Sequence, residues 1–103
     1  YHGFVLGLLS DLREQYQIRS NRESGYGRYD VMLTPLNKND NAIIIEFKVH
    51  EPEEETSLQD TVQSALAQID ERNYDAELLV RGIPADRIRH YGFAFEGKKV
   101  LIG

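Results

Sequence analysis

Residues 42–49 read Ala-Ile-Ile-Ile-Glu-Phe-Lys-Val and form the most apolar stretch of this 103-residue chain. A polar turn, residues 37–41, precedes them and Pro52 follows, which is typical of a strand buried on both faces. Two charged residues, Glu46 and Lys48, interrupt the apolar pattern. Because side chains alternate along a strand, these two share one face and lie about 7 Å apart. The stretch predicts a central strand with an acid and a lysine on one side.

A second acid is expected on the same face. Residues 29–33 have the pattern of a strand, and a polar turn separates them from the central strand. A turn centred on Lys38 would place Asp30 opposite Glu46, and a turn one residue later would place it opposite Lys48. Either register keeps Asp30 on the charged face and its apolar neighbours on the other.

The remaining segments complete a single α/β domain, since a chain of this length is enough for one core. The expected elements are a helix over residues 1–16, strands at 17–23, 29–33 and 42–49, a helix from Thr56 or Ser57 to about Arg72, a short helix at 75–81, and strands at 88–95 and 99–102. This order predicts a central mixed sheet flanked by helices. The chain opens on Tyr1 inside an apolar pattern, so we expect a fragment, from the C-terminal part of a longer protein.

Composition excludes several classes of function. There is no cysteine, which removes thiolate metal sites and cysteine nucleophiles. No apolar run approaches the roughly 18 residues of a membrane span, so a soluble, cytoplasmic protein is expected. The net charge of −5 is concentrated in residues 51–77, which hold nine acids and one base, whereas residues 13–29 and 78–103 are basic. We interpret the acidic block as a solvated surface, and it does not exclude a nucleic-acid partner.

The converging acids suggest a metal site. Two carboxylates at one place repel each other and are costly to bury unless a cation neutralises them. Mg²⁺ binds one or two carboxylates together with water and phosphate oxygens, and a nearby lysine can orient an attacking water or stabilise phosphoryl charge. The alternative is a structural ion pair between Lys48 and either Glu46 or Asp30. Removal of Lys48 distinguishes the metal site from the structural ion pair. It should abolish cleavage in an enzyme, whereas it should destabilise the protein if Lys48 belongs to a buried ion pair.

These residues resemble a known family. Asp30 followed by Glu46-Phe47-Lys48, within this order of elements, is similar to the PD-(D/E)XK nuclease superfamily with its restriction-endonuclease-like fold. Three more tracts resemble the bacterial branch found C-terminal to a predicted AAA-ATPase-like domain: residues 20–30, Ala67-Gln68-Ile69 followed by Tyr74, and residues 92–98. The similarity covers nearly the whole chain. The proline of the family name is absent, because Tyr29 precedes Asp30.

The resemblance implies a Mg²⁺-dependent or Mn²⁺-dependent nuclease that hydrolyses phosphodiester bonds, with DNA as the expected substrate. Its expected partner is an upstream ATPase-like domain in the same chain. Asp30 and Glu46 would be metal ligands, the Phe47 carbonyl would be a third ligand, and Lys48 would orient the nucleophile.

Four further residues are candidates for supporting roles. Gln68 could reach the charged sheet face from its helix, or it could simply lie at the helix boundary. Tyr74 could support the site or belong to the core. Arg28 could bind a phosphate through two hydrogen bonds or be an ordinary surface arginine, and Glu23 could face the strand of Asp30 near the turn.

Two other functions stay open at this point. The domain could be a non-catalytic module that binds nucleic acid or a protein, or a structural domain that pairs through an exposed sheet edge. Metal binding distinguishes the enzyme from both, and salt-dependent DNA binding distinguishes the first alternative from the second.

Overall fold

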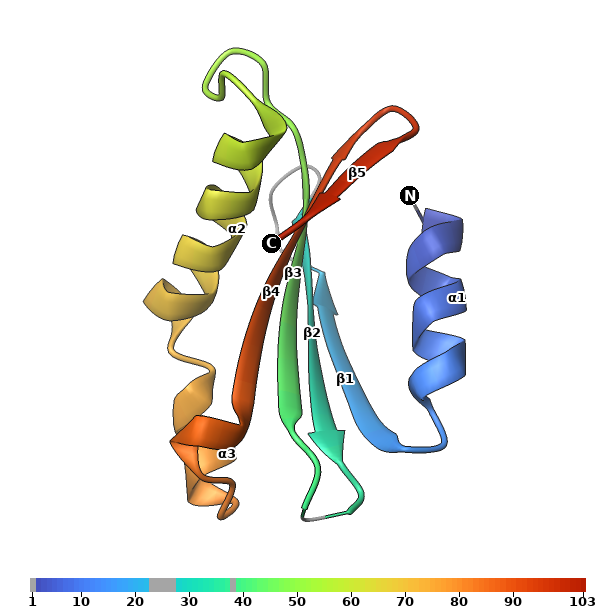
Figure 1. Ribbon diagram of the computed structural model, residues 1–103, viewed down its shortest axis with the longest axis vertical. Coiled ribbons are helices and arrows are strands. Elements are labelled where there is room, and N and C mark those ends of the chain that lie inside the picture. The colour runs from blue at the N-terminus through green and yellow to red at the C-terminus, as the bar shows by residue number, and fades with distance from the viewer. Residues whose placement is uncertain (1, 23–27, 38) are drawn as a thin grey trace.

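The protein has three layers, with a sheet between one helix on one face and two helices on the other (Figure 1). The structure, a computed structural model, describes residues 2–22, 28–37 and 39–103. In chain order, its elements are α1 (His2–Leu12), β1 (Tyr16–Arg22), β2 (Arg28–Pro35), β3 (Ala42–Val49), α2 (Leu58–Arg72), α3 (Asp75–Val80), a short 3₁₀ turn (Ala85–Arg87), β4 (Ile88–Glu96) and β5 (Lys99–Ile102).

The sheet is mixed and has β3 at its centre, in the order β1-β2-β3-β4-β5. All neighbouring strands are antiparallel except β3 and β4, which are parallel. A parallel pair needs a long crossover connection, and α2 and α3 form it. The predicted α/β architecture, a central mixed sheet flanked by helices, is therefore confirmed.

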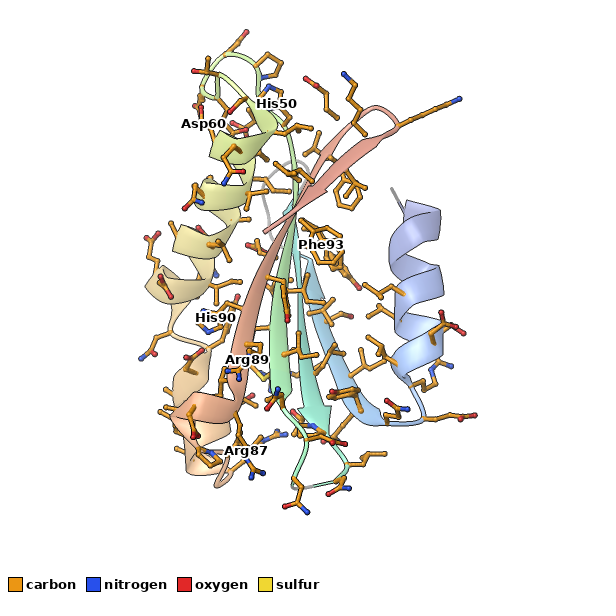
Figure 2. The ribbon with its side chains drawn as sticks, viewed as in Figure 1. His50, Asp60, Arg87, Arg89, His90 and Phe93 are labelled. Carbon is orange, nitrogen blue, oxygen red and sulfur yellow. The ribbon has the colours of Figure 1, made fainter. Side chains whose placement is uncertain are left out.

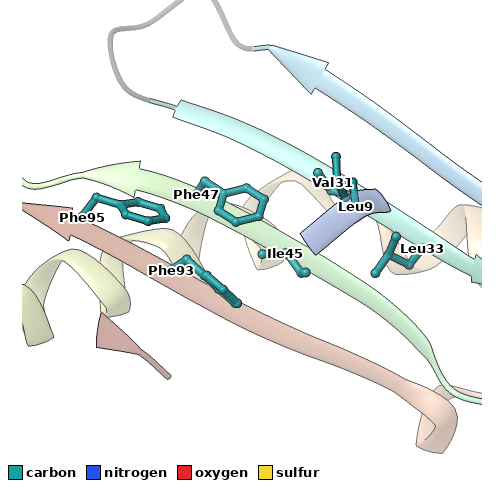
Figure 3. Close-up of a cluster of buried hydrophobic side chains, with 7 residues drawn as sticks. All are labelled: Leu9, Val31, Leu33, Ile45, Phe47, Phe93 and Phe95. Carbon is teal, nitrogen blue, oxygen red and sulfur yellow. The ribbon is translucent and has the colours of Figure 1, made fainter. Parts of the chain in front are cut away.

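One face of the sheet is covered by α1 and holds an aromatic core (Figure 3). The Phe47 ring contacts Phe93 edge to face, with ring centroids 5.1 Å apart. It also stacks on Phe95, with ring centroids 6.1 Å apart. Leu9 of α1 packs over this layer. The opposite face packs against α2 and α3 through a second cluster: Met32, Ala42, Ile44, Ile69, Leu78 and Ile88. The predicted burial of β3 on both faces is confirmed.

The boundaries of the helices follow local chemistry. Ser57 caps α2, since its side chain accepts a hydrogen bond from the Asp60 N–H, and Asn73 ends the helix with a left-handed φ of 52°. The first helix is shorter than predicted, because α1 ends at Leu12 and not near residue 16. Tyr16 begins β1 and packs on the α1-side core from that strand. Tyr16 stands at helical spacing from the apolar residues of α1, although it belongs to β1. Within the described residues, no helix is long and apolar enough to cross a membrane.

Close packing of α2 on β4 depends on Gly92. A Cβ atom there would lie 2.9 Å from the Val62 carbonyl oxygen and 3.1 Å from the Ala65 Cβ. We expect Gly92→Ala to lower the free energy of unfolding by about 1 to 3 kcal/mol, because α2 must move away from the sheet. Thermal denaturation checks this against Gly7→Ala, whose added methyl group meets nothing within 4 Å and should stabilise α1 by up to about 1 kcal/mol. Equal melting temperatures for the two variants would contradict this account.

Candidate functional site

Two carboxylates lie side by side on the face of the sheet that packs against α2 and α3. Asp30 of β2 and Glu46 of β3 are direct partners in the antiparallel register, so their Cβ atoms are about 5 Å apart. This is the register predicted for a turn centred on residue 38. The neighbours Met32 and Ile44 belong to the cluster under α2 and α3. Asp30 is 4% exposed and Glu46 is fully buried at 0%.

Lys48 lies on the same face, and its charge is neutralised within the domain. The side chain is only 2% exposed, and its ammonium group forms a buried ion pair with Glu55 in the connection between β3 and α2. Glu51 Oε1 lies further away, at 3.9 Å from the Lys48 Nζ. The prediction from the sequence paired Lys48 with either Glu46 or Asp30. Glu55 is therefore a site residue that sequence reasoning missed.

The Glu55 carboxylate is held by three donors. Its Oε2 pairs with Lys48, and its Oε1 accepts the Glu51 N–H at 2.8 Å and the Thr61 hydroxyl at 3.0 Å. Burial by itself raises the pKa of the Glu55 carboxyl, but these hydrogen bonds outweigh it and bring the pKa below its ordinary value. Glu55 is thus ionised at neutral pH and balances the charge of Lys48.

His50 extends this network toward the hairpin of β4 and β5. Figure 2 shows it at the end of the molecule where α2 begins. Its Nδ1 lies 2.8 Å from the Thr61 Oγ1. Because Thr61 has one hydroxyl hydrogen, which it donates to Glu55, the His50 Nδ1–H must be the donor. The His50 Nε2 lies 3.6 Å from a carboxylate oxygen of Glu96, so the network joins β3, α2 and the hairpin.

Tyr74 lies at the core and also contacts a candidate site residue. Its ring packs against the cluster under α2 and α3. Its hydroxyl donates a hydrogen bond to the Asp30 Oδ2 at 2.7 Å. Carboxylates that bind metals are commonly oriented by such hydrogen bonds.

The other predicted residues are placed as follows. Gln68 is half-buried on α2 and lies two turns after Thr61, so the two share one side of the helix. The Phe47 ring is in the aromatic core on the opposite face, which leaves its backbone carbonyl as the proposed ligand atom. Arg28 pairs through its backbone with Lys48. The side chain of Arg28 and the whole of Glu23 lie outside the described residues.

The donor set fits a hard divalent cation. Asp30 and Glu46 supply oxygen donors from two adjacent strands, as Mg²⁺ and Mn²⁺ prefer. In the described part of the chain, no group of three or more histidine, aspartate or glutamate side chains is arranged to hold a metal ion. Two carboxylates leave coordination positions for water and phosphate, which suits a site that binds a phosphate substrate together with its metal.

A comparison with known protein families gives the class to which this fold belongs. A family model described as the PD-(D/E)XK nuclease superfamily matches residues 1–103. The chain therefore belongs to the PD-(D/E)XK nuclease superfamily, and its five-stranded mixed sheet is consistent with the restriction-endonuclease-like fold. Enzymes of this superfamily generally use divalent metals. Comparisons with curated proteins and with solved structures found no match.

Proposed function

We propose that this domain is a Mg²⁺-dependent or Mn²⁺-dependent nuclease that hydrolyses phosphodiester bonds of DNA. One observation carries the proposal: Asp30 stands directly opposite Glu46, with Lys48 on the same buried face of the central strand. Membership of a nuclease superfamily suggests the reaction, and the intact set of three side chains favours a working site over a decayed one.

Each residue has a role in this proposal. Asp30 and Glu46 would hold the metal with the Phe47 carbonyl, and Tyr74 would orient Asp30 through its hydroxyl. A divalent cation there supplies the positive charge that polarises a phosphate oxygen. Lys48 lies on the same face of the sheet as the two carboxylates, and its ammonium group would stabilise negative charge that develops on the phosphoryl group. Burial strengthens this effect, because a low dielectric screens the charge less than water does.

Three residues would act around this centre. Arg28 lies across from Lys48 in the strand register, which suits a contact with a substrate phosphate. Gln68 and Glu23 are proposed as supporting residues, Gln68 from α2 and Glu23 from the sequence segment between β1 and β2. An upstream ATPase-like domain in the same chain is the proposed partner.

A second candidate function is a non-catalytic module that binds nucleic acid or protein for such an ATPase-like domain. The observation that favours it is the ion pair of Lys48 with Glu55, which neutralises the lysine without a metal or a substrate. A purely structural polar core would have the same arrangement.

A nuclease assay distinguishes the two functions. The full chain is incubated with millimolar Mg²⁺ or Mn²⁺ and single-stranded, duplex or branched DNA, with RNA as a parallel substrate and a chelator as a control. We expect metal-dependent cleavage of DNA, and a rate at least about 100-fold lower for Asp30→Asn, which removes the charge of one ligand. Salt-dependent DNA binding without cleavage in either metal would instead support the non-catalytic module.

A further inference from the structure

The run of acids after β3 is not uniformly a solvated surface. Glu53 and Glu54 are exposed, whereas Glu55 is only 7% exposed. The backbone turns back at this point, because the N–H groups of Glu54 and Glu55 both donate to the Glu51 carbonyl oxygen, at 3.0 and 2.8 Å. This turn directs the third acid of the run inward, toward the charged face of the sheet.

Two separate elements then fix the orientation of the Glu55 carboxylate. The Glu51 N–H approaches its Oε1 at 2.8 Å from the loop, and the Thr61 hydroxyl approaches the same atom at 3.0 Å from α2. The other oxygen, Oε2, faces the Lys48 ammonium. Thr61 is itself buried and accepts from His50. The carboxylate can therefore rotate little, and it presents one defined oxygen to Lys48.

We propose that Glu55, held by Thr61, is the positioning residue for Lys48. The inference rests on the proposed nuclease function. A lysine side chain has a compact charge on a flexible stem, and a charge-stabilising group is effective only when it is fixed in place before the reaction. Glu55 supplies that fixation from the loop, and Asp30 and Glu46 are the proposed metal ligands. The positioning residue thus lies outside the D...ExK motif.

Steady-state kinetics with Glu55→Gln tests the consequence for the reaction. Glutamine keeps the size of the side chain and removes the charge that holds Lys48. We expect kcat for Mg²⁺-dependent DNA cleavage to fall about 10- to 100-fold, with KM for DNA and the affinity for Mn²⁺ unchanged. Glu54→Gln makes the same change one residue earlier at an exposed position and should leave all three quantities unchanged. Equal kcat for the wild type and Glu55→Gln would overturn the inference.

A spectroscopic readout keeps the inference testable apart from activity. In ¹⁵N-lysine-labelled protein, the ammonium signal of Lys48, assigned by its loss in Lys48→Met, should be protected from solvent exchange. We expect the signal to be lost in Glu55→Gln and kept in Glu54→Gln. Its persistence in Glu55→Gln would overturn the positioning role. If the wild type shows the protected signal but cleaves no DNA, the proposed nuclease function is refuted. The conclusion that Glu55 fixes the Lys48 ammonium would be kept.

Thr61→Val covers the case in which Glu55→Gln folds poorly. This variant keeps the charges of Lys48 and Glu55 and removes the Thr61 hydroxyl, which orients Glu55 and also contacts His50. We expect a smaller fall in kcat, still without a change in KM, and faster exchange of the Lys48 ammonium. A Thr61→Val protein that matches the wild type in both would contradict the claim that Thr61 holds Glu55.

Discussion

Lys48→Met is expected to abolish DNA cleavage and to lower the free energy of unfolding by about 3 to 5 kcal/mol at neutral pH. The loss of cleavage follows from the removal of the ammonium group that is proposed to stabilise charge on the phosphoryl group. The loss of stability follows from the buried pair with Glu55, because the variant leaves that carboxylate buried without its counter-charge. In a chain of this size such a loss lowers the melting temperature by more than about 10 °C. Chemical denaturation and the nuclease assay measure the two effects.

The stability difference between the wild type and Lys48→Met should depend on pH with a definite sign. Burial raises the pKa of Glu55, but the hydrogen bonds from Lys48, the Glu51 N–H and Thr61 bring it below its ordinary value of 4.5. A lowered pKa contributes stability that is present above the ordinary value and is lost as the pH falls through the folded-state pKa. The penalty of Lys48→Met should therefore be full at neutral pH and shrink below about pH 4.5. A penalty that grows toward acid would show that Glu55 is not its source.

The loss of stability in Lys48→Met does not distinguish an enzyme from a structural ion pair, because Lys48 is paired with Glu55 in both cases. The double variant Lys48→Met/Glu55→Gln resolves this. It removes both charges, so it should regain much of the stability lost in Lys48→Met. Cleavage should stay abolished, because no ammonium group returns to the site. A double variant that is stable and cleaves DNA would exclude Lys48 from the reaction.

Glu46→Gln is expected to abolish Mn²⁺ binding together with cleavage and yet to stabilise the metal-free protein. Two carboxylates directly opposite each other on neighbouring strands repel, so removal of one charge should raise the free energy of unfolding by about 1 kcal/mol. Mn²⁺ at 100 times its Kd adds about 2.7 kcal/mol to a protein that binds it only when folded. The wild type should therefore gain melting temperature on addition of Mn²⁺, and Glu46→Gln should not.

Glu53→Gln is the control for this experiment, since Glu53 is exposed in the acidic loop. It should respond to Mn²⁺ as the wild type does. An unchanged melting temperature of the wild type across millimolar Mn²⁺ would count against a metal site at Asp30 and Glu46. A Glu46→Gln protein that is still stabilised by Mn²⁺ would place the metal elsewhere.

The sequence predicts the sheet and the paired acids because strand periodicity is a local property. In residues 42–49 the charged residues Glu46 and Lys48 stand two apart, so the faces of the strand could be assigned, and β3 has the predicted bounds. The turn before it allowed only two registers, and the structure has the one that opposes Asp30 and Glu46. Tyr16 shows the limit of periodicity, since an apolar residue at helical spacing can belong to the next element.

Glu55 could not be predicted by the same means. It stands in a run of acids whose other members are exposed, and nothing in the run distinguishes it. Its role depends on a backbone turn and on Thr61, which comes from α2. The only signal available was the lysine itself, because a buried lysine needs a carboxylate partner. That requirement shows that a partner exists but not where along the chain it lies.

The placement of the site also bears on how the chain folds. The hairpin of β2 and β3 brings Asp30 and Glu46 together through contacts close in sequence, which form readily. The hydrogen bond that stabilises the Asp30 carboxylate comes from further along the chain, since Tyr74 is separated from Asp30 by 44 residues. In the isolated hairpin of β2 and β3, Asp30 and Glu46 repel each other. The contacts with Tyr74 and α2 form only when the segment between β3 and β4 packs on the sheet. The site is therefore complete only when the crossover helices have packed on the sheet.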